Sequence, residues 1–139
     1  MPVRNLLPRL TVILLTIILF AISSYAWSTS FAIQDGETET SSQTLASSET
    51  GTINSGGKLT TSASAINATS ASNITVLNKG TITTDGEGSE GIDVDDSSGT
   101  TTITNSGTIT TSGTTGYGIY SNTNSGTTTV TNSNKITTS

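Results

Sequence analysis

The feature that most constrains the fold of this chain is an internal repeat with a fixed period. Residues 103–111 read ITNSGTITT, and close copies lie 27 positions earlier (76–84, VLNKGTITT) and 27 positions later (130–138, VTNSNKITT). A weaker copy, residues 53–61 (INSGGKLTT), lies 23 positions before the 76–84 copy. A regular period of this kind is typical of stacked structural repeats. The sequence therefore predicts a solenoid with one coil per period.

The amino-acid composition indicates which kind of solenoid the repeats form. Hydrophobic residues make up 31% of the 139 residues, and many of them lie at positions 1–26. The remainder is rich in Thr, Ser, Gly and Asn, which leaves either disorder or a repetitive β architecture, and the regular period favours the second. The chain has no cysteine and no histidine, which excludes disulfides, thiolate metal sites and imidazole catalysis.

Residues 1–26 have the organisation of a secretory signal peptide. Arg4 and Arg9 form a basic region, residues 10–22 an apolar region, and residues 24–26 (SYA) a small-x-small cleavage site. The alternative is an uncleaved membrane anchor, but the apolar run is shorter than the roughly 20 residues that span a bilayer. We therefore expect the export machinery to recognise this segment and the mature chain to begin near Trp27.

The mature chain is acidic. Removal of Arg4 and Arg9 leaves three basic residues against ten acidic ones, a net charge of −7. This charge argues against nucleic acid or an anionic membrane as a partner. Residues 27–50 show no sustained period and are predicted to form a flexible lead segment, in which Phe31 and Ile33 are candidates for a short strand that caps the first coil.

From residue 51 onward, each repeat divides into three short strand-like runs separated by turn residues. In the clearest repeat these runs are 102–105, 108–111 and 118–121, and residues 122–127 (NTNSGT) return the chain to the next coil. Because side chains alternate along a strand, one aliphatic side chain per run faces inward. These inward residues are Ile103, Ile109 and Ile119, preceded by Val76, Ile82, Ile92 and Val94 and followed by Val130 and Ile136. The predicted fold is an all-β parallel β-helix, or β-solenoid, of three to four coils with repeat lengths between 23 and 27, covering positions 51–139.

Asn78, Asn105 and Asn132 recur in register two positions after an inward aliphatic residue. They are therefore expected to face inward and to form a ladder of stacked amides. Gly80 and Gly107 follow two positions later, where a tight turn with positive φ is predicted, and Asn134 replaces them in the last copy.

These corners resemble the repeats of autotransporter adhesin passengers, the type V secreted proteins of Gram-negative bacteria. The matching runs are NKGTI at 78–82 followed by GI at 91–92, and NSGTI at 105–109 followed by GI at 118–119. The resemblance covers residues 51–139 and the signal peptide. It implies an exported structural or adhesive β-helix, associated with the outer membrane and facing host or neighbouring cells.

The sequence departs from that family at its C-terminal side. The printed sequence stops inside a repeat at Ser139, and residues 1–139 contain no translocator barrel. We expect either the N-terminal piece of a longer passenger or coils that stack on another chain.

Residues 85–96 (DGEGSEGIDVDD) hold six of the ten acidic residues. Hard cations such as Ca²⁺ prefer several oxygen ligands, and five residues of this run lie at EF-hand-like offsets: Asp85, Glu87, Ser89, Asp93 and Asp96. Glu90 stands where that loop requires glycine, so the alternative is a solvated acidic loop between the second and third strands. Calcium is thus a possible ligand of this segment.

Outward threonines are a second candidate binding surface. Thr81 and Thr83, Thr108 and Thr110, and then Thr137 form Thr-x-Thr rows, with parallel rows at 102 and 104 and at 129 and 131. Such arrays are similar to the ice-binding faces of β-solenoid antifreeze proteins, although threonine is also simply a favoured strand residue.

The sequence predicts no enzyme. Without histidine no Ser/His/Asp arrangement is possible, and G-x-S-x-G is absent. The six acidic residues of positions 85–96 are expected in one loop rather than fixed on a strand face, where a pair of catalytic carboxylates would have to lie. Tyr117 and Tyr120 are expected to stack or pack rather than to bind sugars.

Overall fold

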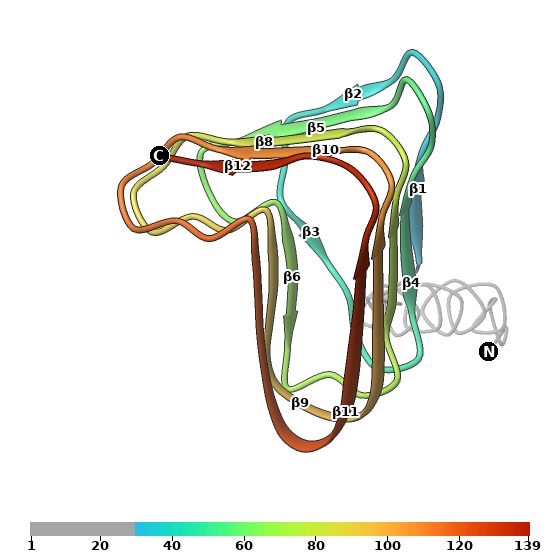
Figure 1. Ribbon diagram of the computed structural model, residues 1–139. Helices are drawn as coiled ribbons and strands as arrows, with labels where there is room; N and C mark the ends of the chain where they lie inside the picture. Colours follow the sequence, from blue (N-terminus) through green and yellow to red (C-terminus); the bar gives the residue numbers. More distant parts are fainter. Residues whose placement is uncertain (1–29) are drawn as a thin grey trace, which may run out of the picture.

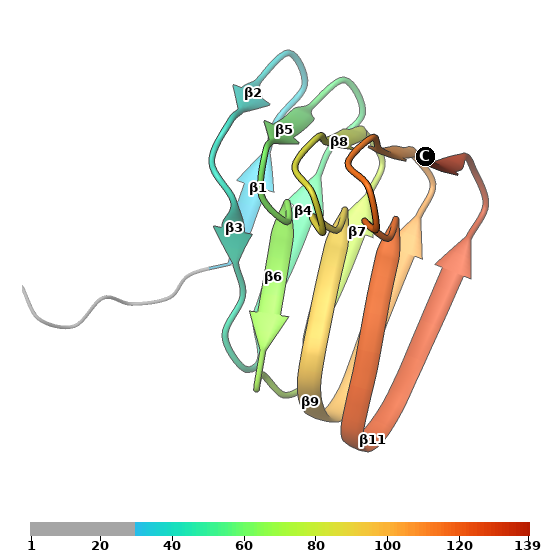
Figure 2. The same ribbon diagram turned by 90° about the vertical axis from the view of Figure 1, so that its left-hand side faces the viewer.

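The computed structural model describes residues 30–139, apart from the side chain of Asp96. Its fold is a parallel β-solenoid of about four turns, and every strand pairing among the described residues is parallel. Figure 1 looks along the stack, and Figure 2 shows the coils side by side. The predicted signal peptide and its cleavage site lie outside the described residues. No helix long and apolar enough to cross a membrane occurs among residues 30–139.

Within each coil, the strands follow one another as the first, second and third of the strand-like runs predicted from the sequence. Their bounds are β1 (Phe31–Ile33), β2 (Thr38–Glu39), β3 (Gln43–Thr44), β4 (Thr50–Ile53), β5 (Lys58–Thr61), β6 (Ile66–Thr69), β7 (Thr75–Asn78), β8 (Thr81–Thr84), β9 (Ile92–Asn105), β10 (Thr108–Thr111), β11 (Ile119–Asn132) and β12 (Ile136–Thr138). One sheet contains the second runs, in the order β12-β10-β8-β5-β2. The other sheet contains the remaining strands, because β9 and β11 each continue from a third run into the next first run (Figure 2).

The long strands differ from the prediction that residues 122–127 form a returning turn. These residues lie inside β11, which pairs with β9 on both arms of the bend, from Ile119 opposite Ile92 to Asn132 opposite Asn105. The chain bends there while the pairing with the neighbouring coil continues, with register shifts between Ser121 and Ser125. Hydrogen bonding to the neighbouring coil therefore replaces a closed local turn.

The described part of the predicted lead segment belongs to the solenoid. β1 pairs with β4, β2 with β5 and β3 with β6, so residues 31–44 form a first coil. The expected short strand at Phe31 and Ile33 is confirmed, but the prediction of a flexible segment does not hold from Ser30 onward.

Periodicity missed this first coil because its repeat is shorter. Phe31 lies opposite Gly51, an offset of 20 positions along the chain. Val76 lies opposite Ile103, an offset of 27 positions. A search at the longer period therefore finds no match for the first coil.

The register of the second coil also differs from the sequence match. Leu59 pairs with Ile82 as predicted, but Ile53 lies opposite Asn78 rather than Val76, and Gly51 lies opposite Val76. The reason is the corner between first and second runs. Positions 54–57 connect β4 to β5, whereas only positions 79–80 connect β7 to β8.

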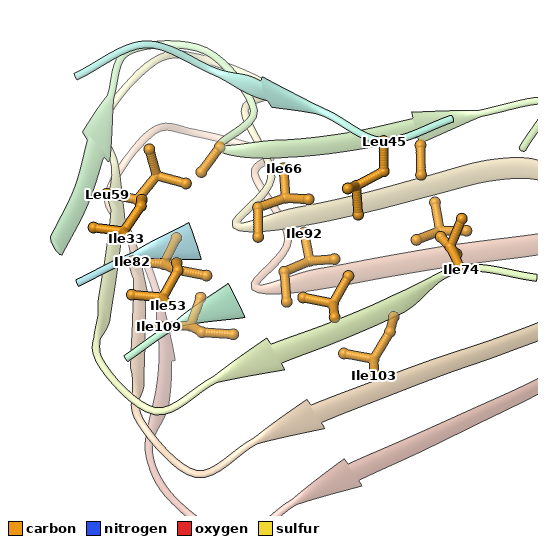
Figure 3. Close-up of a cluster of buried hydrophobic side chains, with 14 of the residues drawn as sticks. Ile33, Leu45, Ile53, Leu59, Ile66, Ile74, Ile82, Ile92, Ile103 and Ile109 are labelled. Atoms are coloured by element: carbon orange, nitrogen blue, oxygen red, sulfur yellow. The ribbon is translucent and has the colours of Figure 1, made fainter. Parts of the chain in front are cut away.

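The core is a set of aliphatic ladders inside the coils (Figure 3). The predicted inward residues of the third coil and of the start of the fourth are fully buried: Val76, Ile82, Ile92, Val94, Ile103 and Ile109. The first two coils add further large buried side chains: Ile33, Leu45, Ile53, Leu59, Ile66 and Ile74. Parallel coils place equivalent side chains about one strand spacing apart. The second-run ladder of Leu59, Ile82 and Ile109 is therefore continuous, whereas the first-run ladder of Ile103 and Val76 ends at Gly51.

The predicted inward residues of the last rung are only partly covered. Ile119 and Ile136 pack against the core but stay partly buried, and Val130 is 46% exposed although its register partner Ile103 is fully buried. These side chains face the open end of the stack at β11 and β12. That end presents the interior pattern of a coil to its surroundings.

Candidate functional site

Asn78, Asn105 and Asn132 form the predicted amide ladder. The Nδ2 of Asn78 donates to the Oδ1 of Asn105 at 2.7 Å, and the Nδ2 of Asn105 donates to the Oδ1 of Asn132 at 2.7 Å. Asn78 and Asn105 are fully buried, and the Oδ1 of Asn78 also accepts the Gly80 N–H at 3.2 Å. At the open end, Asn132 donates to the carbonyl of Asn134 instead. The ladder joins coils through side chains in addition to the backbone.

The glycines of this corner have a different role from the predicted one. Gly80 and Gly107 do not have positive φ. They are required by close packing, because a Cβ on Gly107 would lie 2.1 Å from the Gly80 carbonyl oxygen, and one on Gly80 would lie 2.3 Å from the Gly57 oxygen. Asn134, which follows them in the stack, does not have positive φ either. The corner therefore selects glycine for backbone contact between coils.

The predicted threonine array lies on the sheet of second runs. Thr81 pairs with Thr108 and Thr83 with Thr110, so the four side chains form two aligned rows across β8 and β10. All four are partly exposed. The row of Thr83 extends over four coils, from Thr60 to Thr137, whereas the row of Thr81 ends at Lys58 of the second coil.

A second threonine surface lies on the first runs and is more extensive than the sequence analysis indicated. Thr50, Thr75, Thr102 and Thr129 form one continuous row. The neighbouring row contains Thr52, Leu77, Thr104 and Thr131, so only Leu77 interrupts it. The predicted rows covered only the last two coils of this surface. The constant period reaches Thr75, but Thr50 and Thr52 lie off it, 25 positions before Thr75 and Leu77.

The acidic run is divided between two environments. Asp85, Glu87 and Ser89 lie in the loop between β8 and β9, whereas Asp93 lies on β9 itself. Ser89 is buried, and its hydroxyl donates to the Ser62 carbonyl at 2.9 Å. Among the side chains that the structure describes, no three His, Cys, Asp or Glu residues come together as a metal-binding group. Ser89 thus faces the preceding coil rather than the other predicted calcium ligands.

The carboxyl group of Asp93 has a perturbed pKa. Burial raises the pKa of its carboxyl group, and the negative charges of Glu90 and Asp95 raise it further. Glu90 is fixed by the preceding coil, because its Oε2 accepts the Ser64 hydroxyl at 2.6 Å. Asp95 is held by the next coil, because its Oδ1 accepts the Nδ2 of Asn122 at 2.9 Å. The outer surface at the start of β9 therefore carries a concentration of negative charge.

Tyr117 and Tyr120 lie next to this charge. Their ring centroids are 5.8 Å apart at an interplanar angle of 34°, and the side chains are 57% and 37% exposed. Tyr120 is the register partner of Asp93, and the Gly91 N–H donates to the Tyr117 carbonyl at 2.9 Å, which places Tyr117 beside Glu90. The two rings contact each other in a tilted arrangement, which agrees with the expectation that they stack or pack.

Sequence reasoning missed the pairing of tyrosines with acids. The signal was present, because Tyr117 and Tyr120 lie one full period after Glu90 and Asp93. Applying the period to positions where the copies differ would have brought these residues together.

No protein-family model, curated protein or solved structure matches the chain.

Proposed function

We propose that this chain is the start of an exported, autotransporter-like passenger: a non-enzymatic β-solenoid that serves a structural and adhesive role on a Gram-negative cell surface. The observation that carries the proposal is the stacked corner of the Asn-x-Gly-x-Ile runs. The residues that carry the resemblance, Asn78 and Asn105 with Gly80 and Gly107, are the ones that join successive coils.

The physical character of the fold supports such a role. Inward positions hold aliphatic and amide ladders together with buried hydroxyls such as those of Thr84 and Thr111. Outward positions of the same strands, such as Thr83 and Thr110, are partly exposed. A stack of this kind is lengthened by adding coils, and its outer surface changes without loss of the interior. A rod that holds varied surfaces away from a cell is therefore compatible with the architecture.

The open end supports stacking on a further coil. Val130 and Asn132 present an aliphatic side chain and an amide in the same register as the buried pairs Ile103 with Asn105 and Val76 with Asn78. A coil with an aliphatic residue and an asparagine at these positions would continue both ladders. Missing repeats or another chain are the proposed sources.

Export is tested by expressing the full chain in a Gram-negative host. We expect mass spectrometry to find a mature N-terminus near Trp27, and we expect protease added to intact cells to digest the chain when it is fused to a translocator barrel. Retention of positions 1–26 on a cytoplasmic product would contradict the proposal. Adhesion is tested separately with beads coated with native or heat-unfolded protein, and equal cell binding by both would exclude a role for the fold.

Ice binding through the threonine array is the second candidate function. The observation that favours it is the alignment of Thr81 with Thr108 and Thr83 with Thr110, which sets hydroxyls about 7 Å apart along each strand. We expect thermal hysteresis that is lost in Thr108→Leu and Thr110→Leu. Hysteresis that these variants leave unchanged would remove the array from consideration.

Calcium binding by residues 85–96 stays a prediction. The inward direction of Ser89 disfavours the complete predicted ligand set of Asp85, Glu87, Ser89, Asp93 and Asp96. Calorimetry with Ca²⁺ up to about millimolar concentration, the range of extracellular modules, tests the site. Absence of heat at that concentration would dispose of it.

A further inference from the structure

The two exposed tyrosines have no role in the interior. Ile119, which lies next to Tyr120 in the chain, is the residue of this segment that packs against the core. Tyr117 and Tyr120 instead contact each other on the outside, on a surface otherwise dominated by Thr, Ser and Asn. Exposed aromatic groups with a polar surround are a common feature of interaction sites, because a ring offers a large contact area at a low cost in conformational entropy.

The stacking of coils determines what lies beside the rings. Tyr120 stands opposite Asp93, and the carbonyl of Tyr117 accepts the N–H that follows Glu90. Adjacent parallel strands are about 4.8 Å apart. Each tyrosine therefore has an acidic residue of the preceding coil as its neighbour, and the four residues form one surface across the start of β9 and β11.

The negative charge beside the tyrosines indicates that a ligand of this surface carries a positive charge. Glu90 and Asp95 both add to the negative potential at Asp93. The three lysines of the described residues stand elsewhere: Lys58 begins β5, Lys79 precedes β8 and Lys135 precedes β12. A ligand with a positive charge would relieve this repulsion, and a ring face attracts the same charge.

We propose that Tyr117, Tyr120, Glu90 and Asp93 form a binding surface for a basic side chain, lysine or arginine, of an extended segment in a protein partner. The aliphatic stem or guanidinium plane lies on a tyrosine ring, and the cationic group faces the carboxylates. The inference deepens the proposed adhesive function by naming the chemistry of the partner, and rests on that function only for its biological setting. Contact with one such side chain is weak, so several copies on one surface are needed for firm attachment.

The experiment titrates the purified protein with an acetylated tetra-arginine amide and, in parallel, with the matched tetra-glutamine peptide, and follows amide resonances by NMR. We expect saturable shifts around residues 90–93 and 117–120 with the basic peptide alone. Tyr117→Ser together with Tyr120→Ser should weaken the affinity about tenfold, since each exposed cation–π contact contributes modestly, whereas the two Tyr→Phe changes should preserve it. Circular dichroism confirms folding of each variant.

Asp93→Asn and Asp35→Asn form a matched pair that separates a site from general attraction to an acidic protein. Both remove one negative charge, but Asp35 is an exposed residue of the first coil. Asp93→Asn should weaken binding about threefold, and Asp35→Asn should leave it within experimental error. Equal weakening by the two variants, or full affinity in the double Tyr→Ser variant, would overturn the inference.

A neutral oligosaccharide supplies the other decisive comparison. Sugars also stack on tyrosine, but a neutral sugar does not relieve the repulsion between the carboxylates. Shifts at the same residues with the oligosaccharide and none with tetra-arginine would overturn the inference in favour of a sugar surface. Because peptide binding is measured on the protein alone, it stands or fails independently of export and cell adhesion.

Discussion

The first two coils and the following two fill the same interior corner with different chemistry. In the first two, Ile33 and Ile53 are register partners, and both are buried. In the following two, the corresponding residues are Asn78 and Asn105, joined by a 2.7 Å hydrogen bond. An aliphatic corner is stabilised by burial and tolerates changes in coil length, whereas an amide ladder is directional and requires register.

Coil length follows the same division. The offset between successive first runs is 20 positions from β1 to β4 and 25 positions from β4 to β7, but 27 positions from β7 to β9 and again from β9 to β11. The constant period begins where the amide ladder begins. The comparison indicates that directional interior contacts, together with glycine at the corner, hold the repeat length constant.

The largest expected effect is at the tight corner. Gly107→Ala places a Cβ within 2.1 Å of the Gly80 oxygen, so the backbones of two coils must separate, and we expect a loss of about 4 kcal/mol in the free energy of unfolding. The control is Gly36→Ala in the first coil. It has φ of 77° but no atom within 4 Å, and it should cost about 1 kcal/mol. Urea denaturation followed by circular dichroism measures both, and similar losses would contradict the role of close backbone contact.

Interruption of the amide ladder should have the next largest effect. Asn105→Ala removes the acceptor of Asn78 and the donor to Asn132 inside a buried corner, which should cost about 3 kcal/mol. Asn132→Ala, at the exposed end of the ladder, is the matched control and should cost less than about 1 kcal/mol. If both variants unfold at the same urea concentration, the buried and the exposed amides contribute equally to stability, which would contradict this prediction.

The sequence predicted the repeated part of the fold well. Alternation of aliphatic and polar residues identified the inward side chains Ile82, Ile103 and Ile109, and recurrence of asparagine identified the ladder. It did not identify the first coil, because Phe31, Ile33 and Leu45 have neither the spacing nor the amide of the later copies. Their assignment depends on backbone pairing with β4 and β6, which local sequence patterns do not reveal.

The candidate surfaces were less accessible to prediction. The Thr81 and Thr83 rows follow directly from alternation along a strand. The inward turn of Ser89 depends on a hydrogen bond to Ser62 in another coil, so a spacing argument could not reveal it. Tyr120 lies beside Asp93 because of the pairing register between β11 and β9. The two residues differ in type, so a search for recurring residues does not reveal that they are neighbours.

Extension of the ladder into the second coil would sharpen the comparison. Ile53→Asn places an amide opposite Asn78, whose Oδ1 has a second lone pair beside the one that accepts the Gly80 N–H. We expect a loss of about 2 kcal/mol from reduced apolar burial, offset in part by the new hydrogen bond. The cavity-forming control Ile53→Ala should cost more, about 3 kcal/mol. A greater cost for asparagine than for alanine would show that the second coil does not hold the ladder register.

The smallest expected effect is on the outer surface, where Asn67 of the second coil is the register partner of Asp93 in the third. Asp93→Asn makes the two coils alike at this position. Burial and the charges of Glu90 and Asp95 raise the pKa of Asp93, so the folded state binds more protons than the unfolded state between the unfolded and folded pKa values. The free energy of unfolding therefore falls as pH rises through that window.

After allowance for solvent screening, we expect the variant to be more stable by less than about 0.5 kcal/mol near pH 7, with the difference vanishing below about pH 3. Denaturation midpoints at the two pH values provide the measurement, and a variant that is less stable near pH 7 would mean that the carboxylate makes a favourable contact which asparagine cannot replace.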